Sequence, residues 1–391
     1  MSISRSGQSG AVSLFIVIFA ALLVITVTTA FVRIMIQDQN QATADDLSRS
    51  ALDSANAGVE DAKRLLIKYG QQCGSGPATS PDCQDWYDLM QGSECKALQE
   101  AGIVGAGDEV PVGDDESLQQ AYTCVKITLN TDDYSGSLSP GQSRLIPLKG
   151  EGAFDRVRVE WFSKVNLQDA QVVPRADGSK IVSSDTTTKL TRFADWPQNR
   201  PSLLRTQLLQ FGDNFTMSDF ANNQSGNTNA STLFLMPGTT TGQPADTLRF
   251  VDEYSSGPLQ QVRCDPTFTT ISAGSAYACR ATIQLPLPID AADIQERTAF
   301  LRLGAAYNAR TDFRVSLYSS ATDRVRFDGV QPAVDSTGRA NDLFRRVLSR
   351  VEVSDNGFPY VEGAIDITGD LCKTFSVANN PDGYDPGVCN E

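Results

Sequence analysis

The sequence predicts an α+β protein with a long N-terminal helix, a first head region that contains strands, and a larger all-β, sandwich-like domain. The chain has no proline between residues 11 and 76, and its apolar residues recur at helical spacing up to residue 69. Beyond residue 118, short runs alternate between apolar and polar residues and are separated by turn residues, which is typical of strands. The length of 391 residues leaves room for roughly two or three domains.

The helix begins as an apolar segment. Residues 11–32 read AVSLFIVIFAALLVITVTTAFV, and no charged residue lies between Arg5 and Arg33. At ~1.5 Å per residue this segment can cross the ~30 Å hydrocarbon core of a membrane. Because Arg5 is the only basic residue before the segment, the positive-inside rule predicts a cytoplasmic N-terminus and an extracytoplasmic remainder. A cleaved secretory signal, with its cleavage site at residues 28–30, is the alternative interpretation.

The helical pattern continues beyond the membrane segment. One apolar stripe recurs every three or four residues and consists of Leu47, Ala51, Ala55, Val59, Ala62, Leu66 and Tyr69. The opposite face is charged and polar, and Glu60 and Arg64 are spaced to form an ion pair. Gly70 predicts the end of the helix. A helix over 11–69 that is continuous with the membrane segment disfavours a signal peptide, which has no need of such a continuation.

The cysteines indicate an oxidising compartment. There are eight of them: Cys73, Cys83, Cys95, Cys124, Cys264, Cys279, Cys372 and Cys389. None forms a C-x-x-C motif, so the zinc-ribbon and thioredoxin-like interpretations lack their spacing, whereas the even count favours disulfides. The pairs Cys264–Cys279 and Cys372–Cys389 are preferred because each closes a short loop of turn residues. The pairing among the first four cysteines stays open.

Composition argues against several classes of function. The formal net charge of −14 disfavours a nucleic-acid-binding surface. The sequence contains no histidine, which excludes Ser–His and Cys–His nucleophile pairs and His-ligated metals. We therefore expect a protein without enzymatic activity, catalytic residues or a cofactor, and a hydrolase that uses paired carboxylates is the remaining enzymatic alternative. Asp382 and Asp385 are candidate calcium ligands, although oxygen-rich turns of this kind are more often only turns.

The extracytoplasmic part is predicted to divide into a first head region at residues 70–165, a polar linker at 166–200 and a C-terminal β-rich domain at 201–391. The first region contains runs of alternating apolar residues near 125–129 and 157–161. The last domain contains nine candidate strands, at residues 203–211, 232–236, 247–251, 277–285, 298–307, 313–317, 324–327, 344–353 and 363–367. Residues 335–339, DSTGR, predict a polar turn before the strand that starts at Phe344.

The N-terminal residues resemble a prepilin. Residues 5–10, RSGQSG, form a short basic leader that ends in glycine, and residues 11–15, AVSLF, open the apolar helix. In the type IV pilin family, and most closely in the PilX-type pilus assembly proteins, a prepilin peptidase cleaves at this point. The resemblance therefore implies a leader at residues 1–10 that is removed between Gly10 and Ala11.

The resemblance also implies an architecture and a function. In pilins the upper half of the helix packs on an antiparallel sheet, and the apolar half lies in the inner or cytoplasmic membrane until it packs against other pilin subunits. Most pilins carry Glu as the fifth mature residue, whereas this chain has Phe15, which argues against the major subunit. We therefore expect a minor or tip subunit of a type IV pilus or related filament, located at the cell surface after assembly. A membrane-anchored surface adhesin or binding protein that does not polymerise is the alternative.

Overall fold

The computed structural model describes residues 9–73, 81–92, 94–107, 109–113, 119–139, 141–166, 201–211, 230–238, 247–249, 259–264, 276–289, 298–306 and 310–352. The chain forms two compact units, each made of separate segments. The first, here called the helix unit, comprises Met1–Leu65, Glu94–Lys126 and Val334–Ser349. The second, here called the sandwich unit, comprises Leu66–Ser93, Ile127–Ala333 and Arg350–Glu391. A long apolar N-terminal helix and a larger, mainly antiparallel β domain give the predicted α+β class.

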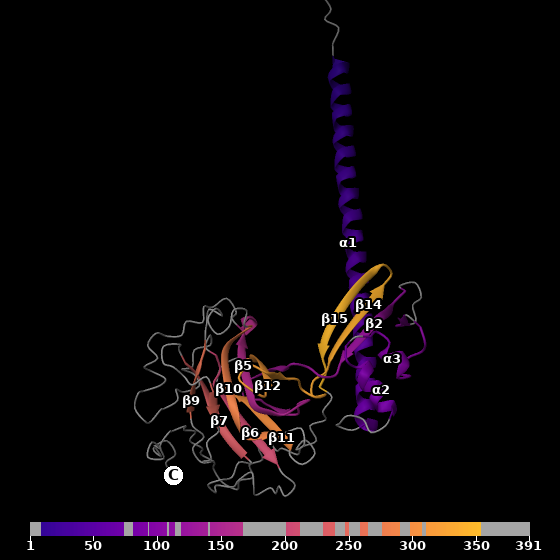
Figure 1. Ribbon diagram of the computed structural model, residues 1–391. Helices are drawn as coiled ribbons and strands as arrows, with labels where there is room; N and C mark the ends of the chain where they lie inside the picture. Colours follow the sequence, from indigo (N-terminus) through magenta and orange to yellow (C-terminus); the bar gives the residue numbers. More distant parts are fainter. Residues whose placement is uncertain are drawn as a thin grey trace, which may run out of the picture. The chain divides into compact units, whose positions relative to one another are not determined.

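Helix α1 runs without interruption over Ser9–Cys73 (Figure 1). The predicted apolar stripe is confirmed from its second residue onward: Leu47 is only half-buried, and the buried residues are Ala51, Ala55, Val59, Ala62, Leu66 and Tyr69. Two predictions about this helix are wrong. Gly70 does not end the helix, since a single glycine costs a helix only about 1 kcal/mol and the chain remains helical as far as Cys73. Glu60 pairs with Lys63 rather than with Arg64, which pairs with Asp61, because the neighbours at i,i+3 lie equally close on the helix surface.

The helix unit contains a small sheet in the order β1-β2-β14-β15 and the short helix α3, Ala97–Glu100. The bounds of its strands are β1 Val110–Pro111, β2 Ala121–Thr128, β14 Ala333–Ala340 and β15 Leu343–Arg350. Two glycines allow α1 and this sheet to approach closely. A Cβ atom on Gly338 of β14 would overlap main-chain atoms of Ala51 and Ala55, and a Cβ on Gly58 of α1 would lie 2.8 Å from Cγ2 of Val125.

The polar turn predicted at residues 335–339 is instead the middle of strand β14, so this prediction is wrong. Burial alternates along the strand, with Val334, Ser336 and Ala340 inaccessible to solvent. The buried positions include a serine and a glycine because larger side chains would separate the strand from α1. Buried and accessible residues therefore alternate along β14, but apolar and polar residues do not.

A buried tyrosine also joins this sheet to the helix. The hydroxyl of Tyr122 on β2 donates a 2.7 Å hydrogen bond to the carboxylate of Asp61 on α1. Burial raises the pKa of Tyr122 well above its usual value near 10, and the hydrogen bond to Asp61 and the charge of Asp61 raise it further.

We expect the stability of the protein to fall above about pH 10, because the unfolded tyrosine then loses a proton that folded Tyr122 keeps. This stability is fully present below the unfolded pKa and is lost as the pH rises, by about 1.4 kcal/mol per pH unit for each such group. Tyr122→Phe removes this contribution and lowers stability by about 1 kcal/mol at neutral pH. Urea unfolding followed by circular dichroism at about pH 8 and about pH 11 measures both effects. An unchanged pH dependence in the variant would contradict the prediction.

The sandwich unit has two sheets. The first has the order β13-β12-β5-β10-β8, with β3 also paired to β12, and the second has the order β4-β11-β6-β7-β9. The first sheet consists of β3 Tyr134–Leu138, β5 Phe154–Ser163, β8 Thr247–Arg249, β10 Tyr277–Ile289, β12 Thr311–Tyr318 and β13 Arg324–Val325. The second consists of β4 Ser143–Pro147, β6 Leu204–Phe211, β7 Ala230–Gly238, β9 Leu259–Arg263 and β11 Thr298–Ala305. Among the described strands of these two sheets, neighbours are antiparallel except for β8 with β10 and β9 with β7, which are parallel.

One hydrophobic core includes side chains from both of these sheets, so the predicted sandwich-like β structure is present. Trp161 and Phe313 come from the first sheet, and Leu208 and Leu301 come from the second. Trp161 is completely buried, and its indole nitrogen donates a 3.0 Å hydrogen bond to the carbonyl oxygen of Ser202. The unit also contains helix α2, Pro81–Leu89, and the 3₁₀ helix η2, Lys164–Asn166.

The segments combine differently from the predicted division at residues 165 and 201. Strand β5 belongs to the predicted first head region, yet it pairs with β10 and β12. Strand β14 belongs to the predicted C-terminal domain, yet it follows β2 in the sheet of the helix unit. Both predicted regions thus contribute to both units, because burial of apolar faces, rather than sequence proximity, selects the partners of a strand. The predicted linker beyond residue 166 and the predicted strand at 363–367 lie outside the described residues.

Candidate functional site

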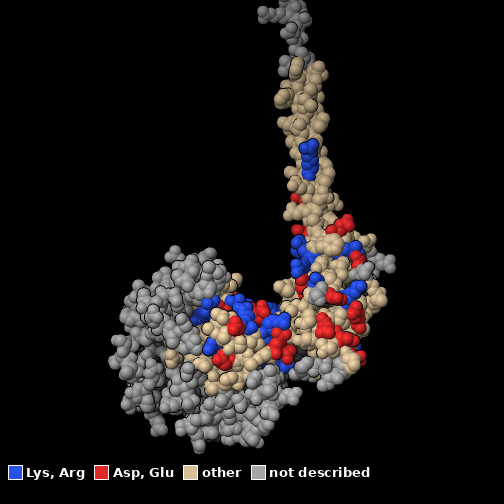
Figure 2. All heavy atoms as spheres, in the orientation of Figure 1, with Lys and Arg blue, Asp and Glu red and all other residues tan. Residues whose placement is uncertain are grey.

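The first half of α1 is an apolar surface without a covering layer among the described residues. Its most apolar 18-residue window has a mean hydropathy of 2.8 and is not buried at all. The large apolar side chains from Leu14 to Ile36 are 46% to 74% exposed. Figure 2 shows this half of the helix almost free of charged side chains. An apolar surface of this length is unfavourable in water and fits the interior of a membrane, so the helix is a membrane anchor by length and composition.

The polar side chains within this segment satisfy their own hydrogen bonds. The hydroxyl of Thr26 donates to the carbonyl oxygen of Leu23, and those of Thr28 and Thr29 donate to carbonyl oxygens one turn earlier, at 2.7 to 2.8 Å. An unpaired donor in hydrocarbon costs several kcal/mol, roughly as much as a lost hydrogen bond in an apolar solvent. The threonines are therefore compatible with a lipid environment.

The predicted cleavage site lies at the start of this helix. Gly10 and Ala11 are within α1, whereas residues 1–8 of the predicted leader lie outside the described residues. Phe15, at the position where most members of the resembled family carry Glu, is 74% exposed on the apolar half. Cleavage between Gly10 and Ala11 stays a prediction.

Six of the eight cysteines form three disulfides. Cys264 and Cys279 are joined, as the sequence predicts. The pairing that the sequence left open is Cys73–Cys83 and Cys95–Cys124. Cys372 and Cys389 lie outside the described residues. Three disulfides in one chain indicate that the part beyond the membrane helix is extracellular.

The candidate calcium ligands Asp382 and Asp385 also lie outside the described residues. Within the described part of the chain, no three His, Cys, Asp or Glu side chains gather closely enough to hold a metal ion.

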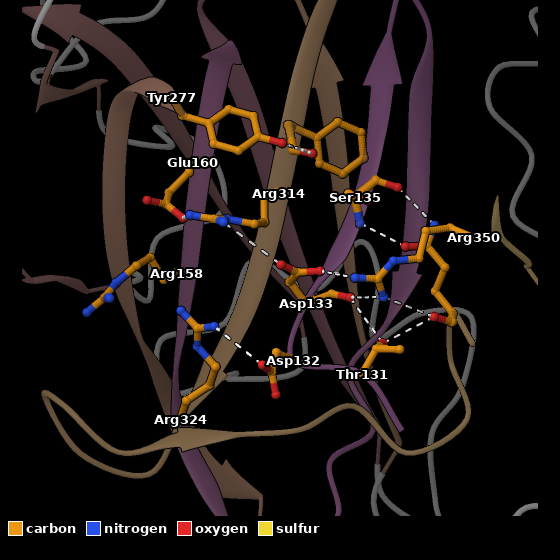
Figure 3. Close-up of polar contacts among 12 residues, drawn as sticks. Thr131, Asp132, Asp133, Ser135, Arg158, Glu160, Tyr277, Arg314, Arg324 and Arg350 are labelled. Atoms are coloured by element: carbon orange, nitrogen blue, oxygen red, sulfur yellow. Dashed lines mark hydrogen bonds and ion pairs between the residues drawn. The ribbon is translucent and has the colours of Figure 1, made fainter. Parts of the chain in front are cut away.

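The sandwich unit carries a polar site that the sequence alone does not predict. The register of three adjacent strands places Arg280 of β10, Glu160 of β5 and Arg314 of β12 side by side. The carboxylate of Glu160, whose side chain is only 2% exposed, accepts hydrogen bonds from both guanidinium groups. Oε1 accepts hydrogen bonds from Nε and Nη2 of Arg280, at 3.0 and 2.9 Å. Oε2 accepts hydrogen bonds from Nε and Nη2 of Arg314, at 2.8 and 2.6 Å, and Figure 3 shows Arg314 beside Glu160.

Two further arginines meet at a tyrosine of the same sheet. The hydroxyl oxygen of Tyr318 accepts a 2.6 Å hydrogen bond from Nη1 of Arg158 and a 3.2 Å hydrogen bond from Nη2 of Arg324. The guanidinium of Arg158 also lies over the Tyr318 ring, 4.0 Å from its centre. Burial lowers the pKa of Arg158, and the positive charges of Arg280 and Arg324 contribute to the lowering.

We call this surface the arginine face and define it as Arg158, Glu160, Arg280, Arg314, Tyr318 and Arg324. The alternating run RVRVEWF at residues 156–162 already indicates that Arg158 and Glu160 share one side of a strand. It does not identify Arg280 and Arg314, which lie 120 and 154 residues further along the chain. Finding them requires the register of β5 with its two neighbours.

An N-terminal apolar helix long enough to span a membrane and a disulfide-bonded remainder together indicate a membrane-anchored protein with an extracellular domain. Comparisons with protein-family models, curated proteins and solved structures give no match. The function must therefore be argued from the chain itself.

Proposed function

We propose that this chain is a pilin-like structural subunit, a minor or tip component of a type IV pilus or a related filament. The observation that supports this most is the continuity of α1, whose apolar half runs into the half that packs on the small sheet. A helix of this kind links a folded head to a membrane segment without a hinge. The prepilin-like residues 5–15 supply the second support.

In this proposal the apolar half of α1 has two successive environments. After prepilin peptidase has removed the leader, residues 11–32 lie in the membrane. During assembly they leave the lipid and pack against the helices of other subunits, so helix contacts replace lipid contacts. Small residues favour such close packing, and Ala20 and Ala21 lie in the segment. Phe15 cannot neutralise the N-terminal amine of a neighbour, which favours a minor or tip position.

Mass spectrometry of the mature N-terminus tests the proposed processing. We expect the protein isolated from its native membrane to begin at Ala11, and Gly10→Val to leave the leader attached. Gly7→Val is the matched control, because it changes another leader glycine away from the cleaved bond and is expected to be processed normally. A mature chain that keeps Met1, or one that begins at Phe31, contradicts the proposal.

Filament assembly separates this proposal from the alternative, a membrane-anchored adhesin that does not polymerise. If the chain is an assembly component, its deletion reduces the number of surface filaments, and sheared filaments contain the protein. If it is an independent adhesin, filaments are unchanged in number and the protein remains with the membrane fraction.

A further inference from the structure

We propose that the arginine face of the sandwich unit binds the carboxylate groups of an acidic saccharide. The proposal goes beyond the function proposed above, and it does not depend on whether the chain polymerises.

The first argument is an excess of positive charge. The arginine face contains four guanidinium groups and one carboxylate, on a chain whose formal net charge is −14. The carboxylate of Asp133 lies 3.9 Å from Arg314, so four arginines face two acidic groups there. None of the hydrogen bonds of Arg158 goes to a carboxylate; its described acceptors are Tyr318, the hydroxyl of Thr282 and the carbonyl oxygen of Ala321. Among the described residues, the carboxylate paired with Arg324 is that of Asp132. It lies 4.0 Å from the guanidinium group, and its side chain is 62% exposed (Figure 3). An anion bound here gains attraction from both arginines, since neither is neutralised by a tightly bound acid.

The second argument is that these donors are already in position. Arg158 and Arg324 converge because both donate to the hydroxyl of Tyr318, and the tyrosine ring supports the guanidinium of Arg158. Glu160 holds Arg280 and Arg314 in the neighbouring row through four hydrogen bonds. Groups that are fixed before binding lose little conformational entropy when a ligand arrives, and the fork of a guanidinium matches a carboxylate.

The third argument concerns the kind of ligand. Among the described residues, no exposed large apolar side chain lies on β5, β10, β12 or β13. Protein partners depend mainly on apolar and aromatic anchors, and membrane surfaces require apolar side chains that insert. The accessible hydroxyl groups beside the arginines are those of Ser319, Ser320 and Thr322, in the turn after β12. The carbonyl oxygen of Ala321 in the same turn accepts a hydrogen bond from Arg158. Charged donors next to hydroxyl groups suit a ligand that carries both carboxylates and hydroxyls, and the extracellular location gives access to such polymers.

Binding of oligogalacturonate to the full-length protein in a neutral detergent tests the proposal. We expect measurable binding that weakens as salt increases, and binding at least tenfold weaker for the methyl ester of the same oligosaccharide, which lacks the charges. The double variant with Arg158→Gln and Arg324→Gln is expected to bind at least tenfold more weakly than the unmodified protein. Arg205→Gln is the matched control, because Arg205 is exposed on β6 of the other sheet, and it is expected to bind normally.

Several outcomes would overturn the proposal. The proposal fails if the protein binds oligogalacturonate and its methyl ester equally tightly, or if it binds neither. It also fails if Arg205→Gln weakens binding as much as the double variant does. Tighter binding of polyglutamate or of anionic lipid vesicles than of oligogalacturonate would also overturn it, in favour of an acidic peptide or a membrane surface. If the double variant fails to fold, the single variant Arg324→Gln decides, because this side chain is 38% exposed and its carboxylate partner, Asp132, is exposed as well. The single variant is then expected to lose affinity severalfold, and unchanged affinity contradicts the proposal.

Discussion

Gly338→Ala is expected to lower the free energy of unfolding of the helix unit by about 3 kcal/mol or more. The new Cβ atom would overlap main-chain atoms of Ala51 and Ala55 and lie 2.8 Å from the carbonyl carbon of Ser54. Main-chain atoms of a helix cannot move aside individually, so α1 and β14 must separate. Separation exposes side chains that are now completely buried, among them Ala51 and Val334.

Hydrogen exchange of the full-length protein in detergent measures this effect, because peptides from residues 45–65 and from β14 report on the helix unit alone. Gly105→Ala is the matched control: a Cβ there meets nothing within 4 Å, and a change within about 0.5 kcal/mol is expected. Gly58→Ala should fall between the two. Its Cβ would meet side chains, which can adjust, and alanine is the better helix former by about 1 kcal/mol. Equal protection in Gly338→Ala and in Gly105→Ala would show that the helix and the strand are not in close contact.

This contact also shows how far the sequence predicts the helix unit. The buried stripe of α1 is visible in the sequence because residues such as Val59 and Leu66 repeat with the period of a helix. The strand that covers it is not visible, because Ser336 and Gly338 occupy positions where an apolar residue would mark a strand. Close packing thus removes the hydrophobic signal by which strands are found.

The sandwich unit shows a second reason why the sequence predicts only part of the structure. Most of its strands are predicted from local alternation, but their partners are not, because β5 pairs with strands more than a hundred residues away. The sequence therefore predicts the sandwich-like class, whereas the pairing of the strands joins segments from both sides of the predicted boundaries. The membrane helix is predicted almost completely, since its signal is local and continuous. The arginine face is not predicted, because it exists only in the register of three strands.

Glu160→Ala is expected to lower the stability of the sandwich unit by about 3 to 5 kcal/mol. The side chain is 2% exposed and accepts all four hydrogen bonds that join Arg280 and Arg314 to it. Its removal takes away the acceptor that these two guanidinium groups share, and it leaves two like charges, 25% and 26% exposed, side by side. Urea unfolding followed by the fluorescence of the buried Trp161 measures the loss, because this residue is next to Glu160 in β5.

Asp132→Asn is the control for Glu160, since it removes a carboxylate from the same unit that is 62% exposed and 4.0 Å from its arginine. A change within about 0.5 kcal/mol is expected there, as for most exposed ion pairs. If Asp132→Asn and Glu160→Ala destabilise the protein equally, the four hydrogen bonds of Glu160 contribute no more to stability than an exposed ion pair does.

The more conservative variant Glu160→Gln separates the structural role of this residue from its effect on charge. The amide keeps the shape of the side chain, but its NH2 group faces the donors of one arginine, so stability still falls by about 1 to 3 kcal/mol. The same change removes the only carboxylate of the arginine face, and its affinity for oligogalacturonate is expected to rise. A purely structural arginine cluster would lose stability without gaining affinity. Opposite changes in stability and affinity would therefore indicate that Glu160 limits the positive charge of a binding surface while it holds the arginines in place.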